Sequence, residues 1–171
     1  ENLVYEVIEE LTFLIQEMYP LALKEKGLAT SIREYVFDWE ARTDIQAQVV
    51  ISGERRLSLD VEQAIYRAIQ ESLSNIARHS HATEVKITLE YSADQIVAET
   101  CDNGCGFDPQ NRQTGMGLRT IRERIESLGG TVRIESERDK GTCVSLTAPV
   151  KSRRLRKGDE NDESNLDRSG G

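Results

Sequence analysis

The sequence predicts an α+β sandwich in which helices cover one face of a largely antiparallel sheet. Helical periodicity dominates the first half of the chain, whereas alternating strand patterns fill most of the second half. The last two strand patterns adjoin each other and predict an antiparallel hairpin. This arrangement is typical of the α+β class.

Two helices are predicted before the first strand. From Glu1 to about Lys26, apolar residues recur at helical spacing, and Pro20 marks a kink or a break. The wide apolar stripe of this helix requires a partner surface. A second helix follows Gly27 and runs to about Arg42, and residues 48–52 then read as a strand.

A third helix is predicted to begin after Ser58, which suits the N-cap position, and to extend toward His79. Acidic Asp60 and Glu62 complement the dipole of its first turn. Its aliphatic residues cluster on one side: Val61, Ile65, Ile69, Leu73 and Ile76.

A polar stripe borders this aliphatic face. Glu71, Asn75 and Arg78 fall within an arc of about 60° on the helical projection. Such a stripe has its base in the core while its polar groups point into a cleft. The helix therefore has the geometry that a ligand site needs.

Four strands and one further helix are predicted downstream. The helix is expected to end at Gly129 and Gly130, which supply a left-handed cap. Residues 151–171 are charged and poor in large apolar groups, so we expect disorder there. The expected strands are 85–91, 95–101, 131–136 and 142–148, and the helix is centred on 118–128.

Composition excludes several functional classes. The net charge is −8, and because residues 151–171 carry six basic and five acidic side chains, residues 1–150 carry −9. This charge argues against nonspecific nucleic-acid binding. No apolar run approaches the roughly 20 residues that span a bilayer, and no signal peptide is recognisable. We expect a cytoplasmic fragment without membrane contact, cut from a longer protein that begins upstream.

The three cysteines, Cys101, Cys105 and Cys143, lack paired CxxC spacing, so the sequence indicates neither a disulfide framework nor a standard zinc site. We expect small buried hydrophobic residues. The alternative, a redox sensor, requires Cys101 and Cys143 to lie on neighbouring strands near a ligand.

Three motifs that follow one another along the chain predict an ATP site. The second motif is expected to bind the adenine base. Asp102 ends a strand and opens a glycine turn, so its carboxylate is placed to accept a hydrogen bond from an adenine amino group. Gly104 and Gly106 let the backbone come close to the base. Taken alone, Asp102, Asn103 and Gly104 are also an ordinary turn signal.

The first and third motifs suit the phosphates and the metal. Asn75 offers a neutral oxygen to Mg²⁺, and Glu71 is placed to take a proton from an attacking group. The third motif, Gly115, Met116, Gly117 and Leu118, precedes a helix N-terminus that favours phosphate. Alternatively, this motif is simply the end of a loop.

Arg78 and His79 add possible side-chain donors for phosphate. The alternatives are that Glu71 and Arg78 are solvated helix charges and that His79 caps the helix C-terminus. His79 and His81 also suggest a metal pair, which we rank below the capping and phosphate readings.

The ordered motifs closely resemble the catalytic domains of two-component sensor histidine kinases, especially the subfamily related to nitrate and lipid-fluidity sensors. Residues 71–79 resemble the family's N box, residues 102–106 its first glycine box, and residues 115–118 its second. The resemblance implies a Bergerat-type ATPase sandwich. No Walker P-loop occurs, which agrees with this different way of binding phosphate.

By that resemblance, Asn75 holds magnesium, Asp102 reads adenine and Glu71 is the general base. Thr142 resembles the threonine that supports the adenine-binding aspartate through water, and the glycines shape a small lid over ATP. Residues 1–27 resemble the end of a dimerisation hairpin, 28–150 the catalytic domain, and 151–171 a tail.

The implied function is transfer of the ATP γ-phosphoryl group to a histidine outside the chain, and from there to a response-regulator aspartate, in a protein that is a homodimer at full length. The alternatives are an anti-sigma-type serine kinase, or a nucleotide-binding regulatory module without transfer activity.

Overall fold

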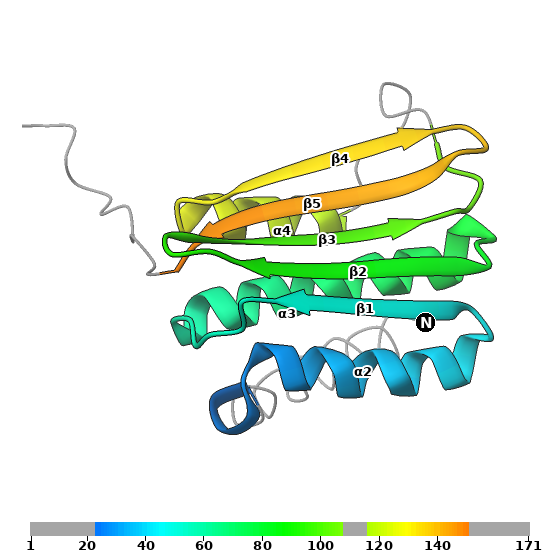
Figure 1. Ribbon diagram of the computed structural model, residues 1–171. Helices are drawn as coiled ribbons and strands as arrows, with labels where there is room; N and C mark the ends of the chain where they lie inside the picture. Colours follow the sequence, from blue (N-terminus) through cyan, green and yellow to red (C-terminus); the bar gives the residue numbers. More distant parts are fainter. Residues whose placement is uncertain (1–22, 108–115, 151–171) are drawn as a thin grey trace, which may run out of the picture.

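The computed structural model describes residues 23–107 and 116–150, and it forms a sheet backed by helices (Figure 1). The three α-helices are α2 (Leu28–Thr43), α3 (Leu59–Asn75) and α4 (Met116–Ser127). The five strands are β1 (Gln46–Ser52), β2 (Glu84–Tyr91), β3 (Gln95–Asp102), β4 (Thr131–Glu137) and β5 (Gly141–Pro149). The α+β prediction is confirmed.

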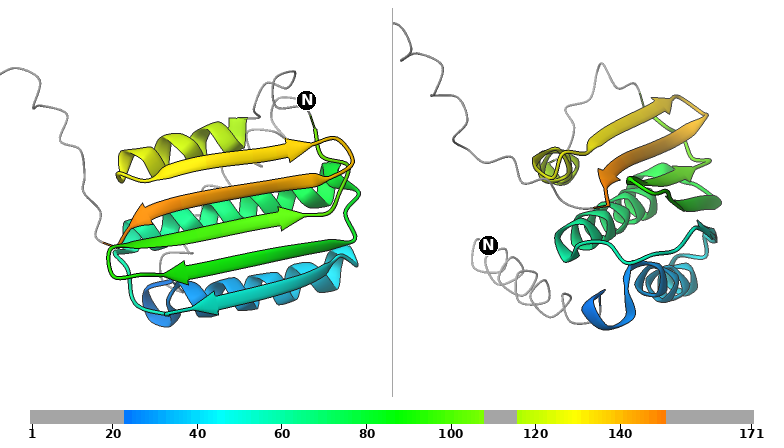
Figure 2. Two further views of the ribbon diagram at one scale, coloured as in Figure 1. Left: turned by 45° about the horizontal axis from the view of Figure 1, so that its top comes forward. Right: turned by 60° about the vertical axis from the view of Figure 1, so that its left-hand side comes forward.

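The strands lie in the order β1-β2-β3-β5-β4. β1 and β2 are parallel, and every other neighbouring pair is antiparallel. A parallel pair needs a crossover, which α3 provides between β1 and β2. The helices gather on one side of the sheet, and its other face is open in the described part of the chain (Figure 2). Within these residues no helix is long and apolar enough to span a membrane.

Side-chain alternation on the central strands builds the core. On β3, Ile96, Ala98 and Thr100 are buried toward the helices, while the residues between them are partly exposed. The predicted aliphatic stripe of α3 is buried in full, from Val61 to Ile76. Burying an aliphatic side chain contributes about 1.5–3 kcal/mol, so this stripe fixes α3 against the sheet.

Two details of the third helix differ from the sequence prediction. Ser58 occupies the N-cap position of α3, as predicted, but its side chain makes no capping bond and its buried hydroxyl lacks a partner in the described residues. The helix also changes after Asn75 into a π-helical turn, η1 (Ile76–Ser80). The other helices end as expected, with Gly129 in the left-handed region at φ 82°.

The cysteine prediction is wrong. Cys101 on β3 and Cys143 on β5 are partly exposed and joined by a disulfide, and Cys105 is a free, exposed thiol. The reason is strand alternation: both bridged residues occupy positions that point to the open face of the sheet. Cysteine spacing alone did not reveal the pairing, but the neighbouring-strand placement of Cys101 and Cys143 that the redox-sensor alternative required is present.

The first described residues are hydrogen-bonded to the loop that precedes α3. The Arg56 guanidinium donates to the carbonyl oxygens of Leu23, at 3.4 Å, and of Lys24. Gly27 has φ 81°, and a Cβ there would lie 2.5 Å from Arg56 Nη1. Residues 23–26 are helical, as predicted for the end of the first helix. The part of that helix before Leu23, with its break at Pro20, and the tail after residue 150 lie outside the described residues.

Candidate nucleotide site

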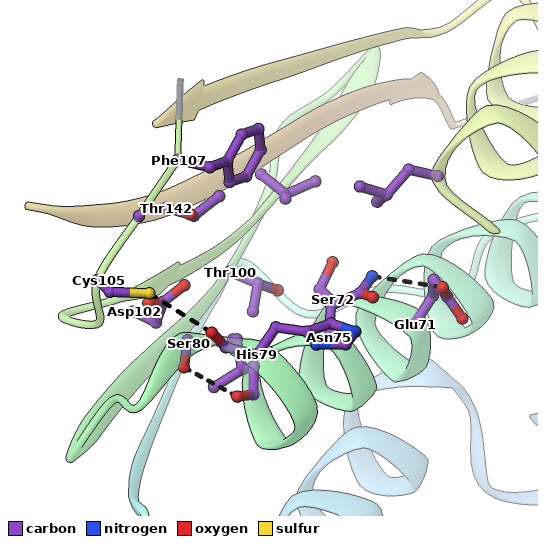
Figure 3. Close-up of a pocket in the computed structure, with 14 residues that line it drawn as sticks. Glu71, Ser72, Asn75, His79, Ser80, Thr100, Asp102, Cys105, Phe107 and Thr142 are labelled. Carbon is purple, nitrogen blue, oxygen red and sulfur yellow. Dashed lines mark hydrogen bonds between the residues drawn. The ribbon is translucent and has the colours of Figure 1, made fainter. Parts of the chain in front are cut away.

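A cavity of about 310 Å³ opens between α3 and the sheet (Figure 3). Phe107 and Thr142 lie across it from the α3 side chains Glu71 and Asn75. The cavity joins segments that are far apart in sequence. Its lining consists of Glu71, Ser72, Asn75, Ile76, His79, Ser80, Thr100, Asp102, Cys105, Gly106, Phe107, Leu118, Thr142 and Val144.

Strand register brings Asp102 and Thr142 together. They are direct partners in the antiparallel β3–β5 pair. Each stands at the end of a row of residues that faces the helices, after Ala98 and Thr100 on β3 and before Val144 on β5. The apolar core therefore passes into a polar wall at this edge.

The Asp102 carboxylate is held in place by backbone donors. The Gly104 N–H donates to Oδ1 at 2.8 Å, and the Thr142 N–H provides a second bond. Burial nevertheless raises the pKa of Asp102, because desolvation outweighs the lowering effect of these two bonds. A partly buried carboxylate with free acceptor capacity suits a neutral N–H donor.

The Thr142 hydroxyl has a partner within the protein. Its Oγ1 lies 2.9 Å from Ser136 Oγ, which also donates to the Gly141 carbonyl oxygen at 3.1 Å. Ser136 Oγ in turn accepts the Phe107 N–H at 2.8 Å. Ser136 therefore joins the segment that carries Phe107 to the start of β5.

Helix α3 places Glu71 and Asn75 one turn apart on the cavity wall. Asn75 Nδ2 donates to Glu71 Oε1 at 3.3 Å, which leaves the Asn75 carbonyl oxygen uncommitted in this contact. Glu71 also packs against the first turn of α4: a Cβ on Gly117 would overlap its carboxylate and lie 3.1 Å from its Cγ. A side chain at position 117 would therefore displace the Glu71 side chain.

The glycines of the first box have a packing role. A Cβ on Gly104 would overlap the Ser80 carbonyl oxygen, and Gly106, at φ 55°, lies against the Glu137 carbonyl oxygen. The sequence analysis also predicts that Gly104 and Gly106 let the backbone come close to an adenine base, and this remains a prediction. Gly115 lies outside the described residues, and Met116 is described only as the first residue of α4.

The π-turn separates the two basic residues of the N box. His79 lines the cavity, whereas Arg78 is exposed and does not line it. The wider turn from Ile76 to Ser80 displaces residues from the α-helical projection on which Arg78 followed Asn75. The Cys105 thiol donates to the His79 carbonyl oxygen at 3.4 Å and joins the first glycine box to this turn.

Sequence reasoning missed several lining residues. Thr100 is 3% exposed at the floor of the cavity, and Ser72 is 4% exposed and donates to the Ala68 carbonyl oxygen at 2.8 Å. The alternation that ends at Asp102 contained a signal for Thr100, a polar residue at a core-facing position. Ile76 and Phe107 gave no signal that separated them from core residues.

The family model of histidine kinase-, DNA gyrase B- and HSP90-like ATPases matches residues 60–152. The chain belongs to this ATPase family. The match includes α3 and all three motifs, so the ATPase reading rests on the same segments that line the cavity. The family implies ATP binding. Together with the sensor kinase relatives described next, it identifies the chain as the ATP-binding catalytic domain of a two-component sensor histidine kinase.

Curated relatives agree with this family. The oxygen sensor histidine kinase NreB of Staphylococcus carnosus is 31% identical over 155 residues, which cover 88% of this chain and 44% of NreB. The sensor protein VraS of Staphylococcus haemolyticus is 32% identical over 170 residues, covering 95% of this chain and 46% of VraS. The chain thus spans less than half of these relatives.

Solved structures support the fold. The histidine kinase domain of the blue-light-activated histidine kinase of Erythrobacter litoralis has a TM-score of 0.60 at 18% identity, covering 72% of this chain and 61% of that one. The Acinetobacter baumannii histidine kinase AdeS has a TM-score of 0.58 at 17% identity, with coverage of 88% and 85%. Both share the ATPase sandwich.

Proposed function

We propose that the cavity binds ATP with its base at Asp102. The observation that carries this proposal is a backbone-held carboxylate in a cavity that also has apolar walls. An adenine ring buries apolar surface and offers an exocyclic amino group, and the carboxylate accepts a hydrogen bond from that group. Phe107 and Val144 supply apolar surface nearby.

The phosphate and metal contacts belong to the opposite side of the cavity. Asn75 would hold Mg²⁺ through its carbonyl oxygen, since Mg²⁺ takes few protein ligands and keeps waters and phosphate oxygens. The start of α4, with Gly115, Met116 and Gly117, and the His79 side chain are the proposed phosphate donors. Arg78 is proposed only as a contact to phosphate groups that extend beyond the cavity, because it does not line the cavity.

The proposed reaction is phosphoryl transfer to a histidine outside this chain. Glu71 would accept or orient the proton of the attacking imidazole, because it lies on the cavity wall one turn from Asn75. A response-regulator aspartate would then receive the phosphoryl group. Residues 1–27 are proposed as the end of the dimerisation hairpin of a homodimer, 28–150 as the catalytic domain, and 151–171 as a tail. We place this domain in the cytoplasm, without nucleic-acid or membrane contact.

The nucleotide proposal is tested by calorimetry of Mg-ATP binding to Asp102→Asn. A hydrogen bond to a charged group contributes about 1.5–3 kcal/mol, so affinity should fall by about tenfold to a hundredfold. Asp94→Asn makes the same chemical change in the exposed turn at the other end of β3. It should bind like the parent chain. Equal affinity in all three proteins contradicts the proposed role of Asp102.

The metal and transfer roles need separate variants. Asn75→Ala should remove the magnesium dependence of ATP binding while leaving metal-free binding in place. Transfer is measured with a phosphoacceptor helix added as a separate peptide and radiolabelled ATP. Glu71→Gln should slow labelling by about a hundredfold, within the range of general base catalysis, at unchanged ATP affinity. Unchanged labelling rules out Glu71 as the base.

A further inference from the structure

Cys101 and Cys143 face each other near one end of the β3–β5 pair. They are register partners in the antiparallel β3–β5 pair, with their Cα atoms 4.0 Å apart and their sulfurs joined. The two residues are 42 positions apart in sequence, so only the fold brings them together. The bridge links the two strands that carry the adenine-side wall of the cavity.

The bridge adjoins the proposed adenine site by one residue on each strand. The next register pair is Asp102 with Thr142, and the Thr142 N–H donates to the Asp102 carboxylate. Successive side chains of a strand point to opposite faces, so the sulfurs lie behind the sheet and the nucleotide cavity in front of it. The bridge therefore acts on the spacing of the strands without occupying the cavity.

Both bridged residues border the open face of the sheet. Two hollows on the open face meet at the bridge: one of about 730 Å³, lined by Cys101, Gln48 and Lys86 among others, and one of about 340 Å³, lined by both cysteines. Both cysteines are partly exposed. Accessible cysteine pairs that become bridged are typical of redox-responsive sites in proteins kept under reducing conditions.

We propose that Cys101 and Cys143 form a reversible thiol–disulfide site, oxidised by hydroperoxides, that sets the affinity of the nucleotide cavity. The inference rests on the proposed nucleotide site. One thiol reduces the peroxide O–O bond, which gives a sulfenic acid and releases an alcohol, or water from hydrogen peroxide. The second thiol then attacks the sulfenic sulfur, the disulfide forms, and water leaves. Dithiols reverse the reaction by thiol–disulfide exchange.

The bridged form is the tighter binder. Asp102 is the last residue of β3, and Thr142 is the second residue of β5, so their pair lies at the end of the ladder, where strands open most readily. The bridge holds the strands together there and keeps the Thr142 N–H on the carboxylate. Without the bridge, part of the free energy of ATP binding is used to order Asp102 and Thr142, so ATP binds more weakly.

The test uses the full 171-residue chain with Cys105→Ser in every arm, because the exposed Cys105 thiol would otherwise compete in exchange. Hydrogen peroxide should remove both remaining thiols within the monomer, as counted by alkylation and intact mass. After the peroxide is removed, Mg-ATP should bind the oxidised form about fivefold more tightly or better, the lower end of typical coupling. Dithiothreitol should reverse the gain, and Cys143→Ser should abolish it.

Linkage provides a second readout. Saturating ATP should favour the protein disulfide, so the [GSH]²/[GSSG] ratio that leaves half of the protein oxidised should rise by the same factor. Persistent thiols, equal affinities of the two forms, or a response that survives in Cys143→Ser each overturn the redox proposal while leaving the nucleotide site intact. If neither these forms nor the chain that keeps Cys105 binds ATP, the nucleotide proposal fails and the redox proposal fails with it.

Discussion

Gly141→Ala should destabilise the domain far more than Gly129→Ala, although both glycines have nearly the same backbone conformation. Their φ angles are 84° and 82°. An L-residue in this region costs about 1–2 kcal/mol, and both variants should lose that amount. The two sites differ in what a side chain would meet.

A Cβ on Gly129 meets only Pro149 Cγ, at 4.0 Å, which is ordinary contact. A Cβ on Gly141 would overlap the Asp102 carbonyl oxygen and lie 2.8 Å from the carbonyl carbon and 3.1 Å from Asn103 Cα. Backbone atoms of a central strand cannot rotate away, so this overlap adds about 1–3 kcal/mol. The expected loss is about 2–5 kcal/mol for Gly141→Ala.

Equilibrium unfolding in urea measures both losses. With a slope of about 1.5 kcal/mol/M, an extra 2 kcal/mol lowers the midpoint of Gly141→Ala by about 1.3 M below that of Gly129→Ala. Gly141→Ala should also weaken Mg-ATP binding, because it displaces the backbone of Asp102, whereas Gly129→Ala should not. Equal midpoints for the two variants refute the argument that the Asp102 backbone dictates glycine at 141.

Three further predictions concern other contacts. Glu62 is 2% exposed, and burial raises the pKa of its carboxyl group. The folded state therefore binds the carboxyl proton more tightly than the unfolded state does. The stability that this proton contributes is present below about pH 4.5 and is lost as the pH rises through the raised pKa. Glu62→Gln should gain stability over the parent across that window in unfolding titrations, and a constant difference between them contradicts the assignment. Gly117→Ala should destabilise the parent, because the new methyl group meets the Glu71 side chain. In a Glu71→Ala background the same change should stabilise the domain by about 0.5–1 kcal/mol, because only the gain in helix propensity remains. A change in unfolding free energy of the same sign in both backgrounds contradicts the contact between position 117 and Glu71. Ser136→Ala removes the hydroxyl that accepts the Phe107 N–H and should cost about 1–3 kcal/mol, measured by thermal and urea unfolding. A change under about 0.5 kcal/mol contradicts a stabilising role for this hydrogen bond.

Local periodicity predicted most of the fold. The stripe from Val61 to Ile76 and the alternation on β3 need only the geometry of one element, and the structure confirms both. Arg78 departs from the predicted polar stripe, because a projection at 100° per residue assumes an α-helix and the chain forms a π-turn there. The prediction of a shared polar face held for Glu71 and Asn75, which precede the turn.

The parts of the site that sequence did not predict depend on which strands become neighbours. β5 pairs with β3 across an intervening helix and strand, and only this register places Thr142 beside Asp102 and Cys143 beside Cys101. The requirement for Gly117 likewise comes from the packing of α4 on Glu71. Spacing along one segment carries no information on such contacts.

The cavity walls come from α3, η1, β3, the loop after β3, α4 and β5. No single helix or strand therefore contains the site, and the unfolded chain has none of its geometry. A ligand that binds only the assembled walls shifts the unfolding equilibrium of the whole domain, by about 2.7 kcal/mol at a hundredfold excess over Kd. Nucleotide concentration would thus help to set how much of this protein is folded, as well as how much of it is loaded.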